Sequence, residues 1–412
     1  MFKTISKCRI CGGEDLASVM SLGEQALTGV FPRSATEKVT SGPVELVQCM
    51  AANGCGLVQL KQSYDLSEMY GMNYGYRSGL NASMVSHLHS KVTKILASGV
   101  LQKDDLVIDI GSNDATTLRA YPQNQFQLVG IDPTGIKFAS YYPPEIKLVP
   151  EFFSAEAVAK ALEGKKAKVI TSFSMFYDLE DPIAFAREIE GSLDANGVWI
   201  FEQSYLPSML RTNSFDTICH EHLEFYALKQ INWISERAGL KVLDVEFNDI
   251  NGGSFSITAA KASAALKPNI AWLNKILADE VALGLDTTHA FDNFKLRVKE
   301  ARIALMDFLN QAKRDGKRVC ALGASTKGNV LLQYYGIDSN LVSAIGEVNS
   351  DKFGAFTPGT FIPLVAEDEL LASNPDYFLV LPWHFRAFFE SLPKMKGRTL
   401  VFPLPQFKIV KI

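Results

Sequence analysis

Two blocks of alternating strand-like and helix-like segments constrain the fold of this chain more than any other feature. In the first block, helical stretches separate four short β-rich runs, at residues 106–110, 127–131, 167–173 and 197–201. The second block has a helix at 326–335 and strand-like runs at 318–323, 341–345, 377–381 and 399–402. Strands that alternate with helices pair in parallel, and their ligands lie at the carboxyl ends of the strands. The sequence therefore predicts an α/β protein with two such units.

Composition and hydrophobic periodicity divide the chain into three parts. Residues 1–82 are rich in Gly, Ser and short apolar runs without a long helical period, so we expect a small, loop-rich module. Residues 83–262 contain a helical pattern at 87–96 and then the first α/β block. Residues 263–412 contain a helical connector, at about 270–313, and the second block. The length of 412 residues suits this division, since a domain takes roughly 150 residues.

The composition excludes several classes of protein. With 47% hydrophobic and 21% charged residues, the chain has the content of a folded protein and not of a disordered one. Its formal net charge of -4 does not favour a nucleic-acid or membrane-surface partner. No run of 18 apolar residues occurs, and Met1 to Cys11 lack the apolar core of a signal peptide. We therefore expect a cytoplasmic protein that binds neither nucleic acid nor a membrane.

Four of the six cysteines lie in the first 55 residues. Cys8 and Cys11 form a C-x2-C pair, whereas five residues separate Cys49 from Cys55, which is wider than the usual spacing. In a reducing compartment, such a quartet indicates a metal site before it indicates disulfides. Four thiolates around zinc leave no open position, so we predict a structural zinc site. The alternative is four unrelated buried cysteines.

The first strand of the first block ends in a turn with a single glycine. Asp109 lies within the strand, Gly111 lets the backbone approach a ligand closely, and Asp132 ends the next strand 21 residues after Gly111. An acidic side chain in that position can accept both hydroxyls of a ribose. The turn is not G-x-G-x-x-G, which weakens a dinucleotide interpretation. The pattern suits S-adenosylmethionine, and the alternative is a plain strand-to-helix turn.

Two of the six histidines lie in the run Cys219-His220-Glu221-His222. Histidine titrates near neutral pH, and Glu221 could orient or charge a neighbouring ring, so the run is a candidate acid–base site. Metal binding is an alternative, although H-x-H supplies only two ligands. A solvated loop is the other alternative.

A second glycine turn, at Gly323, again follows a strand and opens a helix. The helix N-terminus offers backbone donors for a phosphate, Lys327 adds a positive charge, and Glu347 ends the next strand, where it could bind a ribose. These features predict a nucleotide-diphosphate site. The spacing does not fit a P-loop, and a purely structural Rossmann-like turn is the alternative.

Tyrosines are dense at the junction of the first two parts of the chain. Tyr70, Tyr74 and Tyr76 come directly before Arg77-Ser78-Gly79. Their hydroxyl groups could line a pocket, but taken alone these tyrosines favour core packing or a plain linker.

Taken in order, these motifs resemble the sugar C-methyltransferase family. Its best-known members are the 3-C-methyltransferases of deoxysugar biosynthesis, of the mycarose and tetronitrose type. The similarity covers nearly the whole chain. The motifs that carry it are the C-x2-C pair, Gly56-Leu-Val-Gln-Leu60, Tyr74-x-Tyr76-x-Ser78-Gly79, Ile110-Gly-Ser-Asn-Asp114, His220-Glu-His222, Gly252-Gly-Ser254 and Gly323-Ala-x-x-Lys327-Gly-Asn329.

The resemblance implies a fold and a reaction. The fold has a small N-terminal zinc-binding module, a central class I S-adenosylmethionine-dependent methyltransferase domain that is Rossmann-like, and a C-terminal Rossmann-like α/β domain that helps to bind the nucleotide sugar. The substrate is a nucleotide-linked 4-keto-6-deoxyhexose. A base removes the acidic proton on C3, and the enolate carbon attacks the methyl group of S-adenosylmethionine. We expect a monomer or a small homo-oligomer.

The resemblance also assigns roles to residues. His222 corresponds to the base with Glu221 beside it, and His220 and Tyr76 would position the substrate or stabilise the enolate. The residues assigned to the cofactor are Asp109, Gly111, Asn113, Asp114 and Asp132. The residues assigned to the substrate are Tyr74, Ser78, Lys327, Asn329 and Glu347.

The chain departs from the family pattern in two places. Cys219 stands where a tyrosine usually precedes the His-Glu-His run, and residues 172–178 replace a usual Asn-x-x-x-His segment. We expect Tyr177 to take over one of the missing roles. Because both changes concern the active site, methylation at oxygen or nitrogen of a related metabolite is an alternative. A non-catalytic protein that binds nucleotide sugars is another alternative.

Overall fold

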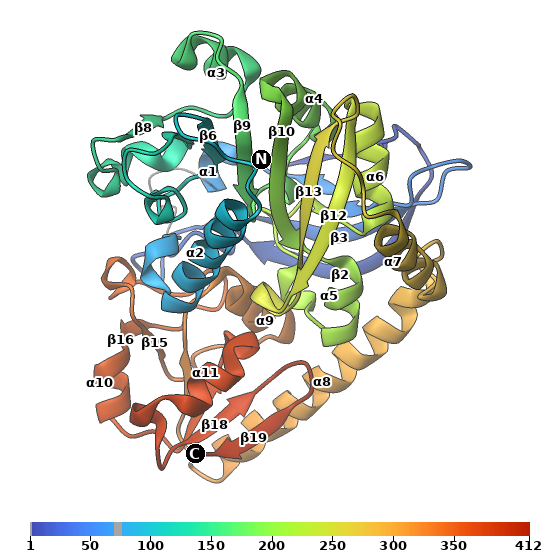
Figure 1. Ribbon diagram of the computed structural model, residues 1–412. Helices are drawn as coiled ribbons and strands as arrows, with labels where there is room; N and C mark the ends of the chain where they lie inside the picture. The colour runs from blue at the N-terminus through green and yellow to red at the C-terminus, as the bar shows by residue number, and fades with distance from the viewer. Residues whose placement is uncertain (1, 70–75) are drawn as a thin grey trace.

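The computed structural model describes residues 2–69 and 76–412. Tyr70 and Tyr74 lie outside the described residues. Figure 1 shows the central part of the chain, teal to yellow, above the C-terminal part in orange and red, with the blue N-terminal strands against the central part. Each of the three predicted parts of the chain has a sheet of its own, in the predicted order. The domain boundaries near residues 82 and 262 stay predictions.

The N-terminal module is built on an antiparallel sheet of four strands in the order β11-β4-β3-β2. The sequence did not predict this sheet. Pairing between β2 and β3 shifts register twice, which breaks the simple alternation by which a strand is recognised in a sequence. The elements are β1 (Lys3–Thr4), β2 (Leu16–Ala26), β3 (Ser41–Cys49), β4 (Val58–Leu60), β5 (Gln62–Ser63) and α1 (Leu66–Met69), with β11 (Glu224–Phe225) contributed from the central part.

The central domain contains a seven-stranded sheet in the order β12-β13-β10-β9-β6-β7-β8. Its strands are parallel except β13, which runs antiparallel to both neighbours. The predictions for β6, β7 and β9 are confirmed to the residue, and β8, β12 and β13 went unpredicted. The strands are β6 (Leu106–Ile110), β7 (Gln127–Ile131), β8 (Ile146–Val149), β9 (Ala167–Phe173), β10 (Leu193–Ser204), β12 (Leu240–Asn248) and β13 (Ser254–Lys261).

Helices cover this sheet, and one predicted helix is nearly missing. After Gly111, Asn113 and Ala115 have φ angles of +50° and +60°, so the chain forms only the short 3-10 turn η2. The α-helices are α2 (Ala82–Ala97), α3 (Ala155–Leu162), α4 (Pro182–Ser192), α5 (Leu206–Thr212) and α6 (Leu228–Arg237). The 3-10 turns are η1 (Ser78–Leu80), η2 (Leu118–Ala120), η3 (Pro133–Ile136), η4 (Ala139–Tyr141), η5 (Phe176–Asp178), η6 (Phe215–Thr217) and η7 (Ile250–Gly252).

Two helices, α7 (Ile270–Ala282) and α8 (His289–Arg314), connect the central domain to the C-terminal domain, and Gly284 at φ +70° lies in the break between them. The C-terminal sheet has six strands in the order β16-β15-β14-β17-β18-β19, and β19 alone is antiparallel. The strands are β14 (Val319–Leu322), β15 (Ile345–Glu347), β16 (Leu364–Ala366), β17 (Tyr377–Val380), β18 (Thr399–Phe402) and β19 (Lys408–Lys411). The helices are α9 (Thr326–Tyr335), α10 (Glu367–Ala372) and α11 (Arg386–Ser391), with 3-10 turns η8 (Ser350–Lys352), η9 (Trp383–Phe385) and η10 (Pro393–Met395).

One sequence prediction in this domain is wrong. The strand expected at 341–345 lies at Ile345–Glu347, because Leu341 still belongs to a turn and the chain first hydrogen-bonds to β14 at Ser343 and Ala344. No helix in the described part of the chain combines the length and hydrophobicity that crossing a membrane would require.

The three parts share a core. Val44 and Leu60 of the N-terminal module, Phe215 of the central domain and Leu305 and Leu331 of the C-terminal part belong to one cluster of buried side chains. The strand β11 also continues the N-terminal sheet by pairing with β4. These contacts hold the segment between η6 and β11, which contains His220 to His222, between all three parts.

Candidate functional site

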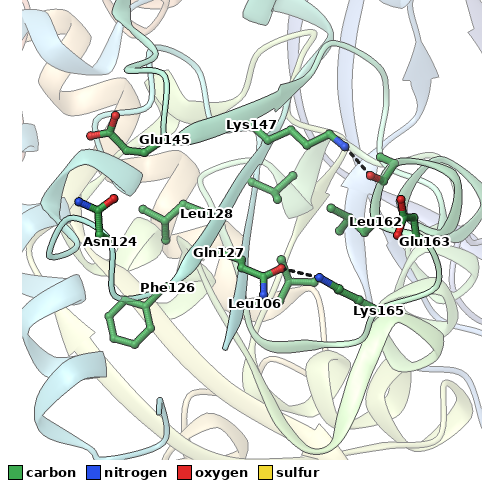
Figure 2. A pocket seen from close by; sticks show the side chains of 12 residues that line it. Leu106, Asn124, Phe126, Gln127, Leu128, Glu145, Lys147, Leu162, Glu163 and Lys165 are labelled. Carbon is green, nitrogen blue, oxygen red and sulfur yellow. Dashed lines mark hydrogen bonds between the residues drawn. The ribbon is translucent and has the colours of Figure 1, made fainter. Parts of the chain in front are cut away.

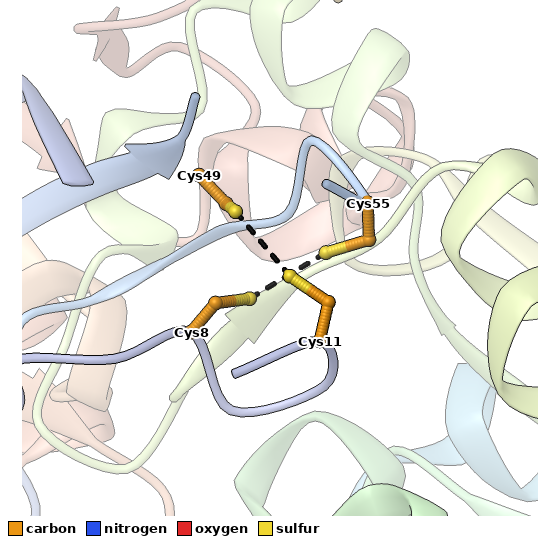
Figure 3. A group of neighbouring side chains, drawn as sticks. All are labelled: Cys8, Cys11, Cys49 and Cys55. Atoms are coloured by element: carbon orange, nitrogen blue, oxygen red, sulfur yellow. Dashed lines mark hydrogen bonds between the residues drawn. The ribbon is translucent and has the colours of Figure 1, made fainter. Parts of the chain in front are cut away.

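The four N-terminal cysteines meet in one place. Their sulfur atoms all lie within 4.8 Å of one another, and Figure 3 shows them converging from two loops. The Cys8 and Cys55 sulfurs are 3.5 Å apart, and those of Cys11 and Cys49 are 3.4 Å apart. A Cβ atom on Gly54 would lie 3.1 Å from the Cys49 sulfur, so glycine leaves room for the cluster. Four convergent thiols fit a closed tetrahedral zinc site, as the sequence predicts.

The two loops that carry the four cysteines also contact the central domain. Arg9, between the first two cysteines, donates to the carbonyl oxygen of Leu60 at 2.5 Å, and its Nε lies 3.8 Å from a carboxylate oxygen of Glu224. Gln230 of α6 donates to the carbonyl oxygen of Cys55 at 2.8 Å. Burial raises the pKa of Glu224 well above its ordinary value, which the neighbouring Arg9 opposes. The zinc site therefore supports β11, which begins two residues after His222.

The first glycine turn lies at the carboxyl end of β6 and is held by side chains. Asp132 accepts a hydrogen bond from the backbone N–H of Asn113 at 2.8 Å. The side chains of Asn113 and Asp114 accept from the backbone N–H groups of Ser78 and Gly79, each at 3.0 Å. Ser78 therefore contacts the turn through its backbone. The structure brings the predicted cofactor residues together, and their contacts with S-adenosylmethionine stay a prediction.

The two acidic residues of this unit have different surroundings. Asp109 is buried, and its carboxylate accepts from the hydroxyl of Thr171 at 2.5 Å; burial raises its pKa to about 7. Asp132 caps η3 by accepting from Thr134 N–H at 2.7 Å with its second oxygen. A carboxylate has about four lone-pair sites, so Asp132 keeps capacity for a ribose hydroxyl.

Tyr76 lies at the rim of this turn. Its side chain is 46% exposed, and its carbonyl oxygen accepts from the Asn113 side chain at 3.3 Å. Arg77 stacks over the ring of Tyr141 at 4.6 Å and lies 3.8 Å from the Asp114 carboxylate. Tyr74, the other tyrosine assigned to the substrate, falls on residues that the structure does not describe.

His222 is held in one tautomer. Its Nδ1 donates a hydrogen bond to the carbonyl oxygen of Thr217 at 2.7 Å, which leaves Nε2 with a lone pair. The ring stands edge-on to Tyr177, with ring centres 4.4 Å apart. Burial lowers its pKa to about 4, and the positive charge of Lys327 contributes to that shift. His222 is therefore neutral near pH 7 and can accept a proton at Nε2.

The other two members of the run contact the N-terminal module. His220 is fully buried, donates to the carbonyl oxygen of Gln25 at 3.2 Å and lies edge-on to Tyr64. Glu221 accepts from the hydroxyl of Thr28 at 3.3 Å, and burial raises its pKa. The structure thus places His222 beside Tyr177, and His220 and Glu221 against the zinc-binding module. Their predicted roles toward the substrate stay predictions.

The C-terminal domain sends two side chains from α9 into this region. Lys327 Nζ donates to the carbonyl oxygen of Asn251 at 2.5 Å, and the Asn329 side chain donates to the carbonyl oxygen of Thr28 at 2.7 Å. Glu347 behaves differently. Its carboxylate accepts from the backbone N–H groups of the second turn and of its own loop, those of Ala324, Val348 and Asn349, at 2.8 to 3.1 Å. Substrate binding by these residues stays a prediction.

Sequence reasoning missed an acidic residue and its partners. Asp216 is fully buried and accepts from the indole N–H of Trp383 at 2.7 Å, across 167 positions of sequence. His384 follows Trp383 directly, and the charge of Lys327 contributes to lowering its pKa. A signal was available, because Trp383 and His384 follow the carboxyl end of the parallel strand β17.

A pocket of the central domain lies away from these residues. Figure 2 shows a pocket of about 410 Å³ lined by Leu106, Gln127 and Lys147, among others. Leu106 and Gln127 are the first residues of β6 and β7, so this pocket opens at the amino ends of the strands. Ligands of parallel sheets bind at the opposite edge, and we exclude this pocket from the site.

Comparisons with known families cover most of the chain. Residues 8–70 match a family model described as a zinc binding domain, and residues 84–245 match one described as a methyltransferase domain. Residues 249–405 match the model described as a C-methyltransferase C-terminal domain. The C-methyltransferase NovU of Streptomyces niveus is 27% identical to this chain over 421 aligned positions, which cover 99% of the chain and 97% of NovU.

Solved structures resemble part of the chain. The magnesium protoporphyrin IX methyltransferase ChlM of Synechocystis PCC 6803, with bound S-adenosylmethionine, is 14% identical with a TM-score of 0.32. That match covers 43% of this chain and 79% of ChlM. The glycopeptide N-methyltransferase MtfA, also with S-adenosylmethionine, is 11% identical with a TM-score of 0.33, over 42% of this chain and 93% of MtfA.

Proposed function

The chain is an S-adenosylmethionine-dependent methyltransferase of the C-methyltransferase family with an N-terminal zinc-binding domain, and we propose that it methylates C3 of a nucleotide-linked 4-keto-6-deoxyhexose. S-adenosylmethionine and structural zinc are its cofactors. The sugar, the methylated carbon and the base are the parts that we propose. They rest on the motifs of the sequence and on the geometry around His222.

The tautomer of His222 is the observation that carries the proposal. A carbon acid next to a ketone needs a neutral base within reach, oriented so that its lone pair faces the C–H bond. The hydrogen bond from Nδ1 to the Thr217 carbonyl fixes the ring and leaves Nε2 to take the proton. Because the pKa of His222 lies below neutral pH, its ring is already uncharged and need not lose a proton before the reaction starts.

Two assigned tyrosines lie at different parts of the proposed site. Tyr177 of η5 packs against the His222 ring, and Tyr76 lies beside the Asn113 turn, near the end of β6. When bound, S-adenosylmethionine supplies an electrophilic methyl group. We assign its binding to the turn at Gly111, where the backbone N–H of Asn113 donates to the carboxylate of Asp132.

The substrate is tested by incubating the purified protein with S-adenosylmethionine and a panel of nucleotide-linked 4-keto-6-deoxyhexoses. We expect one member to gain the mass of a methyl group, and NMR of the product to place that group on C3. A methyl group on oxygen or nitrogen of the product would instead support the alternative of O- or N-methylation. Binding of both ligands without a mass gain on any member would support the non-catalytic alternative.

The base is tested by the variant His222→Gln. We expect kcat to fall by about 10²- to 10⁴-fold, the usual contribution of a general base, while S-adenosylmethionine still binds. The matched control is His289→Gln, because His289 has 90% of its side chain exposed on α8. The wild-type rate should fall as pH drops through about 4, since the active form of His222 is the neutral one. Unchanged activity in His222→Gln would show that His222 is not the base.

A further inference from the structure

Lys327 belongs to the C-terminal domain by sequence but reaches the central domain with its ammonium group. It is the second residue of α9, and Ser325 caps that helix by accepting from Gly328 N–H at 3.1 Å. The cap fixes the direction in which the first turn of the helix presents its side chains. From there, Lys327 Nζ donates to the carbonyl oxygen of Asn251, in η7. An ammonium group has three N–H donors, and among the described residues this carbonyl is its one hydrogen-bond partner.

Asp216 lies in η6, which packs against α9 through the rings of Phe215 and Tyr335, whose centres are 5.1 Å apart. Burial raises the pKa of Asp216, and the positive charge of Lys327 opposes that shift. One of its carboxylate oxygens accepts from Trp383, and the other has no hydrogen-bond partner in the described part of the chain. Burying a charged carboxylate without a partner costs free energy, and a nearby cation offsets part of that cost. The attraction of Asp216 raises the pKa of Lys327, against the larger effect of burial, which lowers it.

The first turn of α9 also lies beside the loop of the proposed base. Asn329 donates to the carbonyl oxygen of Thr28 at 2.7 Å, and the hydroxyl of Thr28 donates to Glu221, the neighbour of His222, at 3.3 Å.

The positive charge of Lys327 contributes to lowering the pKa of the rings of His222 and His384. Cys219 is the remaining titratable group that faces Lys327, and burial raises the pKa of its thiol. A thiol is a weak hydrogen-bond donor, so Cys219 offers little to a developing anion. Lys327 is therefore the strong hydrogen-bond donor on the helix that lies beside the His222 loop.

We propose that Lys327 is a catalytic residue whose ammonium group stabilises the enolate oxygen formed when His222 removes the substrate proton, and that Asp216 is its positioning residue. This inference rests on the proposed function. It assigns Lys327 to the reacting end of the substrate, in place of the diphosphate end suggested by its position after a glycine turn.

The step is a proton transfer followed by carbon–carbon bond formation. The C3–H bond breaks, its proton moves to Nε2 of His222, and its electron pair forms a C3–C4 double bond while the carbonyl pair moves onto the C4 oxygen. Lys327 faces that oxygen as the negative charge develops on it. The enolate then restores the ketone as C3 bonds to the methyl carbon, and the electron pair of the broken S–CH3 bond stays on sulfur.

The test compares Lys327→Met with wild type, after wild type has been shown to methylate a member of the panel. Loss of one oxyanion donor typically lowers kcat by about 10²- to 10³-fold, and we expect that loss with little change in KM for the sugar nucleotide. Lys317→Met is the matched control, because Lys317 is an exposed lysine of the same domain that pairs with Asp376. Thermal unfolding and S-adenosylmethionine binding show whether each variant folds.

Two further variants keep the proposal testable if Lys327→Met fails to fold. Lys327→Arg should retain part of kcat and move the alkaline limb of the pH–rate profile upward, because guanidinium stays charged. Asp216→Asn should move that limb downward, since removing the carboxylate lowers the pKa of Lys327.

The possible outcomes separate the two proposals. No methylation of any panel member by wild type would overturn the proposed function and with it this inference. Methylation at C3 by wild type, together with a Lys327→Met variant that raises KM at unchanged kcat, would overturn the inference alone. That result would return Lys327 to the phosphate end of the substrate. An alkaline limb that stays in place in both Lys327→Arg and Asp216→Asn would also overturn it.

Discussion

Gly111 and Gly323 each follow the first strand of a largely parallel sheet, β6 and β14, with φ angles of +70° and +78°. Each turn is also braced in the same way by the acidic residue that ends the neighbouring strand. Asp132 accepts from Asn113 N–H at 2.8 Å, and Glu347 accepts from Ala324 N–H at 3.1 Å. Judged by local sequence alone, both turns could hold a nucleotide.

Their surroundings differ. Beside Gly111, a Cβ atom would meet the flexible side chain of Met175 at 3.3 Å, whereas beside Gly323 it would meet the ring of Pro382 at 2.5 Å. The first turn leads into a loop whose polar side chains contact Ser78 and Gly79, and the second leads at once into the ten-residue helix α9. We infer that the first turn serves a ligand and the second aims Lys327 at a neighbouring domain. A glycine turn therefore indicates a nucleotide site only where the space beside it is open.

The largest expected effect is on S-adenosylmethionine binding, where Asp132 and Glu347 should differ. Asp132→Asn should raise the dissociation constant of S-adenosylmethionine about 10- to 100-fold, the effect of losing a hydrogen bond to a charged group worth about 1.5–3 kcal/mol. Glu347→Gln should leave that constant unchanged. Isothermal titration calorimetry on the two variants measures both values. Equal weakening by the two substitutions would end the distinction between the turns.

The next effect concerns stability. Gly323→Ala should lower the free energy of unfolding by about 3 kcal/mol, because the left-handed backbone disfavours alanine and the new methyl group meets the rigid Pro382 ring. Gly111→Ala should cost about 1 kcal/mol, since the backbone cost remains but Met175 can move. Denaturant unfolding of both variants gives the comparison. A larger loss for Gly111→Ala would show that the first turn is the more crowded one.

The smallest effect tests the aiming role of the second turn. Ser325→Ala removes the N-cap of α9, and Ser154→Ala removes the N-cap of α3, which accepts from Ala157 N–H at 3.0 Å. Each should cost about 1 kcal/mol of stability. Only Ser325→Ala should also lower kcat, by about threefold to tenfold, because it loosens the direction of Lys327. Steady-state kinetics at saturating substrate would contradict this if both caps lowered kcat alike.

Buried parallel strands were the most predictable part of the fold. β6, β7 and β9 are short apolar runs bounded by turn residues, and their predicted bounds match the structure. Strand β2 was missed because its register shifts break the alternation of buried and exposed residues. Strand β15 was misplaced because the apolar residues before it resemble the start of a strand, although Leu341 still belongs to a turn.

Sequence motifs indicated some members of the candidate site, but they missed Asp216 and Trp383 and did not show the directions of the side chains. The cysteine spacing led to the zinc cluster, and the His-Glu-His run led to His222. No sequence rule separates His220 from His222, because the loop that carries them is irregular and neighbouring side chains point to different domains. The contact between Asp216 and Trp383 joins positions 167 residues apart, and only the packing of the C-terminal domain on the central domain creates it.

The central claim is that His222 forms an enolate at C3, and hydrogen exchange tests it without the transfer step. The protein is incubated in D2O with the accepted keto sugar nucleotide and with S-adenosylhomocysteine in place of the methyl donor. Wild type should incorporate deuterium at C3, seen by NMR, and His222→Gln should not. Wild-type-like incorporation of deuterium by His222→Gln would contradict the central claim.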